Sequence, residues 1–168
     1  MRKVFVSLAA VVCLVAPWTG QAEVKPADDV TVFQTLFAVK GPFRGPNNAL
    51  RGIPGAVRPR VIDEVRGEVK ANGHVKVIVR GLVLANHPDV LPADHGFNPH
   101  PYFRAVVSCL SVNDNGKPTV VNVRTRRAAA NILGDAAIVD DIDLPRPCVA
   151  PIVFVTAPRG QWLAASGR

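Results

Sequence analysis

The sequence has 168 residues, of which 20 are Lys or Arg and 13 are Asp or Glu, so its formal net charge at pH 7 is +7. A chain of this length fits one domain with a sizeable core. The basic excess is mild and contains no long run of like charges, which argues against a nucleic-acid-binding protein.

The amino terminus has the layout of a secretory signal peptide. Met1-Arg2-Lys3 precedes an apolar stretch from Val4 to Ala16, and Gly20-Gln21-Ala22 has the small residues of a cleavage site. The stretch is shorter than the roughly 20 residues that span a bilayer as a helix. We therefore expect residues 1–22 to be a signal peptide and residues 23–168 to be a single secreted domain, extracellular or periplasmic, without a transmembrane segment. An uncleaved anchor is the alternative.

Cysteine usage agrees with an oxidising compartment. Of the three cysteines, Cys13 lies in the expected signal peptide, so Cys109 and Cys148 remain as a pair. We expect them to form a disulfide. A free nucleophilic Cys109 is disfavoured because it lies in an apolar run. Cleavage also removes Arg2 and Lys3, which leaves 18 basic against 13 acidic residues and a net charge of +5.

The first part of the mature chain combines a strand with an irregular segment. Thr31 to Lys40 alternates with apolar residues on both faces, which predicts a strand buried on both sides. Residues 41–60 then contain Pro and Gly at short intervals, so little regular structure is expected there. A loop of about 20 residues inside a compact domain is either functional or partly disordered.

The next two segments predict a β-hairpin. Val61 to Val69 and Val75 to Leu84 each place valines on one face and charged residues on the other. A three-residue loop over Ala71-Asn72-Gly73, with Gly73 in a left-handed conformation, pairs the valines on one face of the hairpin. On the opposite face this register sets Glu68 opposite Lys76 and Glu64 opposite Arg80.

The remaining segments predict more strands. Residues 86–102 form a second irregular segment rich in proline, followed by a near-continuous apolar strand over residues 103–112 and a turn at residues 113–116. Further strands are expected over residues 119–123, 131–144, 148–155 and 161–163, and residues 126–133 fit one or two helical turns. We expect an all-β fold, an antiparallel β-sandwich of about seven to eight strands with one disulfide, with a closed β-barrel as the alternative.

Three segments also resemble a known group of proteins. Arg51 to Gly55, Phe103 to Leu110 and Leu144 to Val155 resemble small secreted bacterial proteins of uncharacterised function. The resemblance implies export and a single domain, and it implies no particular site.

One candidate site is a metal centre. Three of the four histidines and two aspartates lie close together in the second irregular segment: His87, Asp89, Asp94, His95 and His100. Imidazole and carboxylate groups are ligands for zinc or copper. Their spacing matches no established motif, so a metal site here would require the loop to fold back on itself.

We prefer a non-enzymatic function without a cofactor. The leading hypothesis is a secreted or cell-envelope module that binds a partner through loops 41–60 and 86–102, because loops on a rigid sandwich commonly carry function. The residues selected for this surface are Arg51, Ile53, Pro54 and Arg104. The basic charge makes an anionic envelope polymer or a protein the expected partner. A metal-binding protein or metal-dependent enzyme using loop 87–100, and a purely structural module, are the alternatives.

Overall fold

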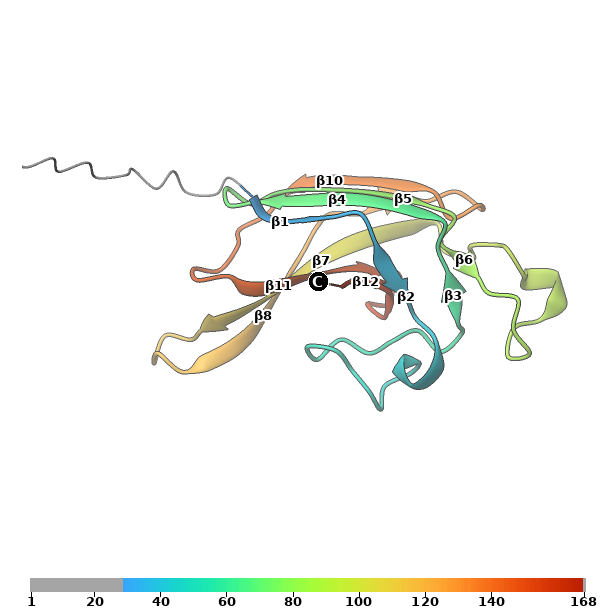
Figure 1. Cartoon of the computed structure of the whole chain (residues 1–168), viewed down its shortest axis with the longest axis horizontal. Helices are drawn as coiled ribbons and strands as arrows, with labels where there is room; N and C mark the ends of the chain where they lie inside the picture. Colours follow the sequence, from blue (N-terminus) through green and yellow to red (C-terminus); the bar gives the residue numbers. More distant parts are fainter. Residues whose placement is uncertain (1–28, 168) are drawn as a thin grey trace, which may run out of the picture.

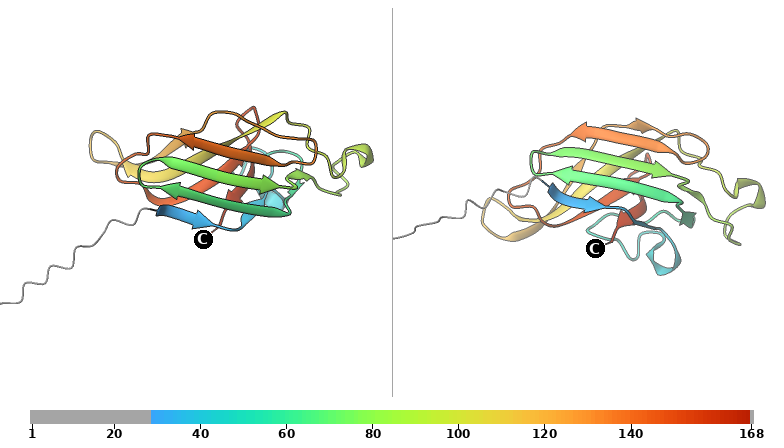
Figure 2. Two further views of the ribbon diagram at one scale, coloured as in Figure 1. Left: turned by 90° about the horizontal axis from the view of Figure 1, so that it is seen from above. Right: turned by 45° about the horizontal axis from the view of Figure 1, so that its top comes forward.

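Two antiparallel sheets face each other in the computed structural model, which describes residues 29–167 (Figure 1). The expected signal peptide over residues 1–22 lies outside the described residues. The first sheet has the strand order β1-β4-β5-β10. Its strands are β1 (Asp29–Phe33), β4 (Glu64–Lys70), β5 (His74–Arg80) and β10 (Ala136–Asp141). They lie side by side when the sandwich is seen from above (Figure 2).

The second sheet has the strand order β2-β12-β11-β7-β8, and the short β9 pairs with β7. Its strands are β2 (Leu36–Ala38), β12 (Trp162–Ser166), β11 (Val149–Thr156), β7 (Tyr102–Val112), β8 (Pro118–Arg124) and β9 (Ala128–Ala129). A third, two-stranded sheet pairs β3 (Arg60–Val61) with β6 (Val83–Leu84). Two short 3-10 helices, η1 (Gly41–Phe43) and η2 (Pro92–Asp94), lie in the loops.

The structure confirms the predicted fold class. Eight strands of the described chain have five or more residues, and the shorter β2, β3, β6 and β9 add local pairing. Neither large sheet returns to its first strand, so the sheets do not close into the alternative barrel. The two 3-10 helices in residues 29–167 are far too short to cross a membrane.

The strand predicted over residues 31–40 is wrong in one respect. The chain forms two strands, and β1 pairs with β4 in the first sheet whereas β2 pairs with β12 in the second. Phe33 on β1 and Leu36 on β2 are both buried. The apolar residues on both faces of this segment therefore reflect a crossing from one sheet to the other, because each sheet needs its own inward side chains.

The predicted hairpin register is confirmed. Val69 pairs with Val75 and Val65 with Val79, and Gly73 in the three-residue loop has a φ of 92°. β5 nevertheless ends at Arg80, earlier than the predicted strand over residues 75–84. Gly81 has a φ of 66° and turns the chain, so the residues after it form β6 in the small sheet.

The core is one cluster of buried side chains drawn from both large sheets. Val65 and Val77 of the first sheet and Phe103, Val155 and Leu163 of the second are examples, each 3% exposed or less. Burial of such side chains contributes on the order of 1.5–3 kcal/mol each. This shared core fixes the sandwich and makes it a rigid support for the loops at its ends.

The disulfide between Cys109 and Cys148 is confirmed. Cys109 lies on β7 and Cys148 directly precedes β11, and the two strands are neighbours in the second sheet. Their Cα atoms are 4.8 Å apart. The bridge therefore fastens the start of β11 to β7, the strand predicted from the apolar run over residues 103–112.

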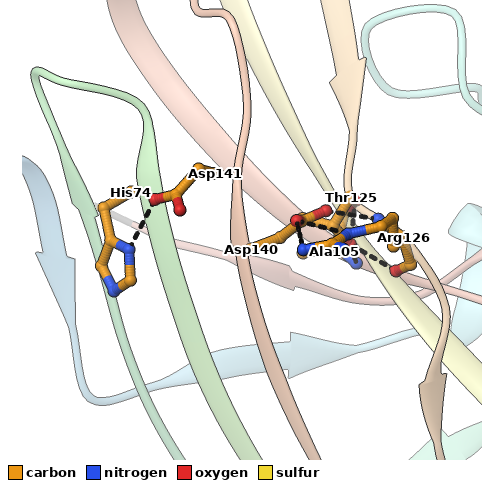
Figure 3. A network of polar contacts seen from close by, with 6 residues as sticks. All are labelled: His74, Ala105, Thr125, Arg126, Asp140 and Asp141. Carbon is orange, nitrogen blue, oxygen red and sulfur yellow. Dashed lines mark hydrogen bonds and ion pairs between the residues drawn. The ribbon is translucent and has the colours of Figure 1, made fainter.

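A polar network holds the chain where it passes from the second sheet to the first (Figure 3). Asp140 on β10 is 7% exposed and accepts hydrogen bonds from the backbone N–H and the Nε of Arg126, at 2.6 and 2.8 Å. Thr125 beside it accepts a hydrogen bond at Oγ1 from the backbone N–H of Ala105, at 3.0 Å. The predicted helical turns over residues 126–133 are wrong, because this segment instead forms β9 and a turn at Gly134.

Candidate functional site

The five predicted metal ligands do not converge on one point. Two of them, the carboxylates of loop 86–102, each face an arginine of loop 41–60. Asp89 lies 2.5 Å from Nη1 of Arg44, and Asp94 lies 3.1 Å from Nη1 of Arg58. The hydrogen bond from Arg44 lowers the pKa of Asp89 below its ordinary value. Both carboxylates are therefore occupied by guanidinium groups.

The histidines of this loop also have separate partners. His87 Nδ1 accepts a hydrogen bond from the backbone N–H of Asp89 at 3.1 Å, and His95 Nε2 donates to the carbonyl of Val90 at 3.1 Å. Within residues 29–167, no three His, Cys, Asp or Glu side chains lie close enough together to hold a metal ion. The geometry thus offers the predicted metal ligands no common centre.

His100 is the third member of the predicted set that meets an arginine. Its Nε2 accepts a hydrogen bond from Nη2 of Arg60 at 3.0 Å, since a guanidinium has only donors. Burial, with a smaller effect from Arg60, lowers the pKa of His100 to about 4. His100 is therefore neutral at physiological pH and adds no positive charge.

These three contacts place the two predicted binding loops side by side. Each contact joins an arginine of residues 44–60 to a residue of loop 86–102. A backbone hydrogen bond from Ala85 to the carbonyl of Pro59, at 3.0 Å, joins the same two segments. Both loops leave the sandwich at the end where β3 and β6 lie (Figure 1).

A pocket of about 450 Å³ lies at the junction of the two loops. The first loop and β3 contribute Ala56, Val57, Arg58 and Arg60, and the second loop contributes Pro99 and His100. The turn between β11 and β12 supplies the third wall, with Ala157, Pro158, Arg159 and Gln161. Pockets of this volume are of the usual size for small ligands.

Arg60 is the most unusual residue of this pocket. It is 4% exposed, and its Nε and Nη1 atoms are buried without a hydrogen-bond partner. No Asp or Glu of residues 29–167 forms an ion pair with it; the partner of its third nitrogen is neutral His100. Burial, and secondarily the charge of Arg58, lowers the pKa of Arg60 to about 10. It remains protonated at pH 7 and, among the residues that the structure describes, is a buried cation without a counter-ion.

Local structure explains why Arg60 is held inside. The backbone N–H of Arg60 donates to the carbonyl of Val39 at 2.9 Å, and Arg60 pairs with Leu84 across the small sheet. On this two-residue strand Arg60 is buried whereas Val61 is 44% exposed. The alternation of a strand therefore directs the arginine inward and the valine outward, which is the reverse of their usual preference.

The pocket has an excess of positive charge. Arg58 is balanced by Asp94, whereas Arg159 on the turn is exposed and has no ion-pair partner in the described part of the chain. His100 is neutral. Arg60 and Arg159 thus provide two uncompensated guanidinium groups, and a guanidinium matches carboxylate and phosphate oxygens by paired hydrogen bonds.

The residues predicted for the binding loop lie away from this pocket. Arg51 donates from Nη2 to the carbonyl of Ala150 at 3.0 Å, Ile53 is 8% exposed, and the carbonyl of Pro54 accepts a hydrogen bond from Trp162 at 2.9 Å. These contacts attach loop 41–60 to the outer face of the second sheet. Arg104 lies on β7, with its guanidinium 5.8 Å from the centre of the Tyr102 ring.

Sequence reasoning located the two loops but missed the central residue of the pocket. Arg60 was placed at the boundary of loop 41–60, and nothing in a single sequence marks it as buried. The turn with Arg159 was not associated with either loop, because the pairing of β11 with β12 was not predicted. A charged residue at the boundary between the proline-rich loop and a segment of alternating valines was the only available signal.

Comparison of the chain with protein-family models, with curated proteins and with solved structures finds no match. The resemblance to small secreted bacterial proteins therefore stays an expectation, and any function is to be argued from the pocket itself.

Proposed function

We propose that this protein is a secreted or cell-envelope module that binds an anionic ligand in the pocket between loops 41–60 and 86–102. The observation that carries the proposal is Arg60, a buried guanidinium with two unpaired nitrogens and no acidic partner among the described residues. An isolated buried charge is unfavourable, so a protein that retains one has a reason to do so. Both nitrogens are buried, so a bound carboxylate, sulfate or phosphate group would supply the missing acceptors once the Arg60 side chain turns toward the pocket.

Two further observations support this proposal. The disulfide between Cys109 and Cys148 is typical of proteins that fold in an oxidising compartment. The pocket lies where two loops and a turn meet on a rigid sandwich, which is a common location for binding sites. Its walls apart from the arginines and His100 are Ala, Val, Pro and Gln side chains, none of which is a nucleophile or a general base.

The proposal is tested by titration of residues 23–168 with sodium phosphate, sulfate and acetate, followed by calorimetry and thermal unfolding. Binding is expected to raise the free energy of unfolding by about 2.7 kcal/mol when the anion is at a hundred times its Kd. Arg60→Met is expected to abolish the effect. Arg124→Met is the matched control, because Arg124 is exposed on β8 and outside the pocket.

Arg60→Lys separates charge from geometry. Lysine retains the positive charge but loses the planar fork of donors, so binding is expected to weaken at least tenfold rather than disappear. Equal binding by the wild-type and Arg60→Met proteins would refute the proposal, as would the absence of any anion effect on the wild-type protein.

A further inference from the structure

A second pocket adjoins the first along the same junction. It has a volume of about 350 Å³ and is lined by Arg44, Gly45, Pro46, Val57, Arg58 and Asp89. Val57 and Arg58 also line the first pocket. The two pockets therefore adjoin at Val57 and Arg58, and together they are here called the arginine groove, which carries Arg44, Arg58, Arg60 and Arg159.

Two of the four arginines in this groove are covered by carboxylates. Arg44 faces Asp89 and Arg58 faces Asp94, and both aspartates belong to loop 86–102. The side chains of Arg58 and Asp94 are 48% and 41% exposed. Ion pairs this exposed contribute little to stability. A polyanion can therefore replace Asp94 on Arg58 without a large loss of folding free energy, whereas Arg44, 27% exposed, holds Asp89 in a less exposed pair.

The walls of the arginine groove narrow the choice of ligand. No Phe, Tyr or Trp lines either pocket, and the one imidazole, that of His100, is hydrogen-bonded to Arg60. A groove for single-stranded nucleic acid typically offers aromatic rings on which bases stack. Several guanidinium groups set mainly among Ala, Val, Gly and Pro side chains instead match a polymer that carries one anionic group on each of several sugar units.

We propose that the arginine groove binds a linear acidic polysaccharide with repeated carboxylate or sulfate groups, and that Asp89 and Asp94 compete with it for Arg44 and Arg58. The inference rests on the proposed function, since one anionic group of the polymer occupies the Arg60 pocket. Further groups then reach Arg58 and Arg44. Loop 86–102 thus acts as a built-in acidic competitor that weak or short anions do not displace.

The dependence of affinity on the length of the oligosaccharide provides the first test. Galacturonate and oligogalacturonates of two to eight units are titrated into the wild-type protein at constant salt, with heparin oligosaccharides of equal length as the sulfated arm. Affinity is expected to rise at least tenfold between one unit and the longest oligomer, because each added contact becomes intramolecular. Arg44→Met is expected to lower the affinity for the oligomers while leaving that for the monomer within about twofold.

Removal of the competing carboxylates provides the second test. The double variant Asp89→Asn, Asp94→Asn is expected to bind oligomers about 2- to 30-fold more tightly, as two exposed ion pairs are lost. Asp114→Asn with Asp143→Asn is the matched control, because it makes the same change in net charge at exposed positions outside the groove. It is expected to change the affinity less than twofold.

The possible failures are distinguishable. If simple anions bind through Arg60 but oligomers bind no more tightly than the monomer, the groove inference is wrong and the proposed function stands. If no anion binds, both are wrong. Tighter binding of a single-stranded oligonucleotide than of the oligosaccharides would overturn the assignment of the polymer. Equal affinities of the Asp89, Asp94 double variant and its control would refute the competitor role.

Discussion

Replacement of Arg60 by methionine is expected to make the protein more stable while removing its anion binding. The pKa of Arg60 is lowered to about 10, mainly by burial. At about 1.4 kcal/mol for each tenfold change in the ionisation equilibrium, the charged form is disfavoured in the folded protein by about 3 kcal/mol. Because the folded-state pKa lies below the unfolded one, this penalty is fully present at pH 7 and diminishes only above about pH 10.

Methionine removes the charge and retains a similar length. The variant loses the hydrogen bond to His100, which contributes about 1 kcal/mol. The net expectation is therefore an increase of about 1–2 kcal/mol in the free energy of unfolding, within the range found when buried charges are replaced by apolar residues. Such a gain on loss of a binding group is the usual sign of a site maintained at the expense of stability.

Urea unfolding followed by tryptophan fluorescence measures this change. A chain that begins after residue 22 has one tryptophan, Trp162, which is buried between Phe43 and Phe154. The m-value is expected to stay constant, so that the midpoint reports stability directly. Arg60→Lys is the control and is expected to give no gain. A decrease of more than about 1 kcal/mol in Arg60→Met would refute the reasoning and assign Arg60 a structural role.

Three further changes test the fold and the site. Replacement of Cys109 and Cys148 by alanine is expected to lower the free energy of unfolding by about 4 kcal/mol in the chain-entropy model, given their separation of 39 residues; a loss below about 1 kcal/mol in urea titrations would contradict this. Because burial lowers the pKa of His100 to about 4, the unfolded chain binds a proton between about pH 6.5 and 4 that the folded protein does not. Stability should fall over that window by about 1–2 kcal/mol after allowance for solvent screening, and His100→Gln should remove this part of the fall. The hydrogen bond from Arg126 lowers the pKa of Asp140, so the stability it provides is present above the ordinary aspartate pKa and is lost as the pH falls through the folded-state value. Asp140→Asn is expected to lower the free energy of unfolding by about 1–3 kcal/mol at pH 7 and to reduce the loss of stability at acid pH. An unchanged dependence of stability on pH would exclude this role.

The parts of the fold that follow from local pattern could be predicted. The register of β4 with β5 followed from two requirements that coincide, valines on one face and a left-handed glycine in the loop. The disulfide followed from a count of cysteines, because assigning Cys13 to the expected signal peptide leaves one pair. The contacts that fix the hairpin register lie within one continuous segment of the chain. The disulfide involves a single pair of cysteines, so only one pairing was possible.

The parts that depend on distant packing could not be predicted. Residues 31–40 read as one strand because alternation does not reveal to which sheet each half belongs. The predicted ligands Asp89, Asp94 and His100 were chosen by residue type, and the arginines that engage all three lie 36 to 45 residues earlier in the chain. A sequence shows which side chains are able to bind a metal ion, whereas the partners that these side chains meet depend on the tertiary fold.

The position of β12 has a consequence for the order in which the domain folds. β2, near the amino end, pairs with β12, which also pairs with β11. A chain that emerges amino end first therefore presents β2 long before the strand that holds it. Topologies dominated by such distant pairings fold slowly. For the secretion proposed above this delay would be an advantage, since a chain crosses a membrane extended and the second sheet cannot be completed until residues 162–166 have emerged.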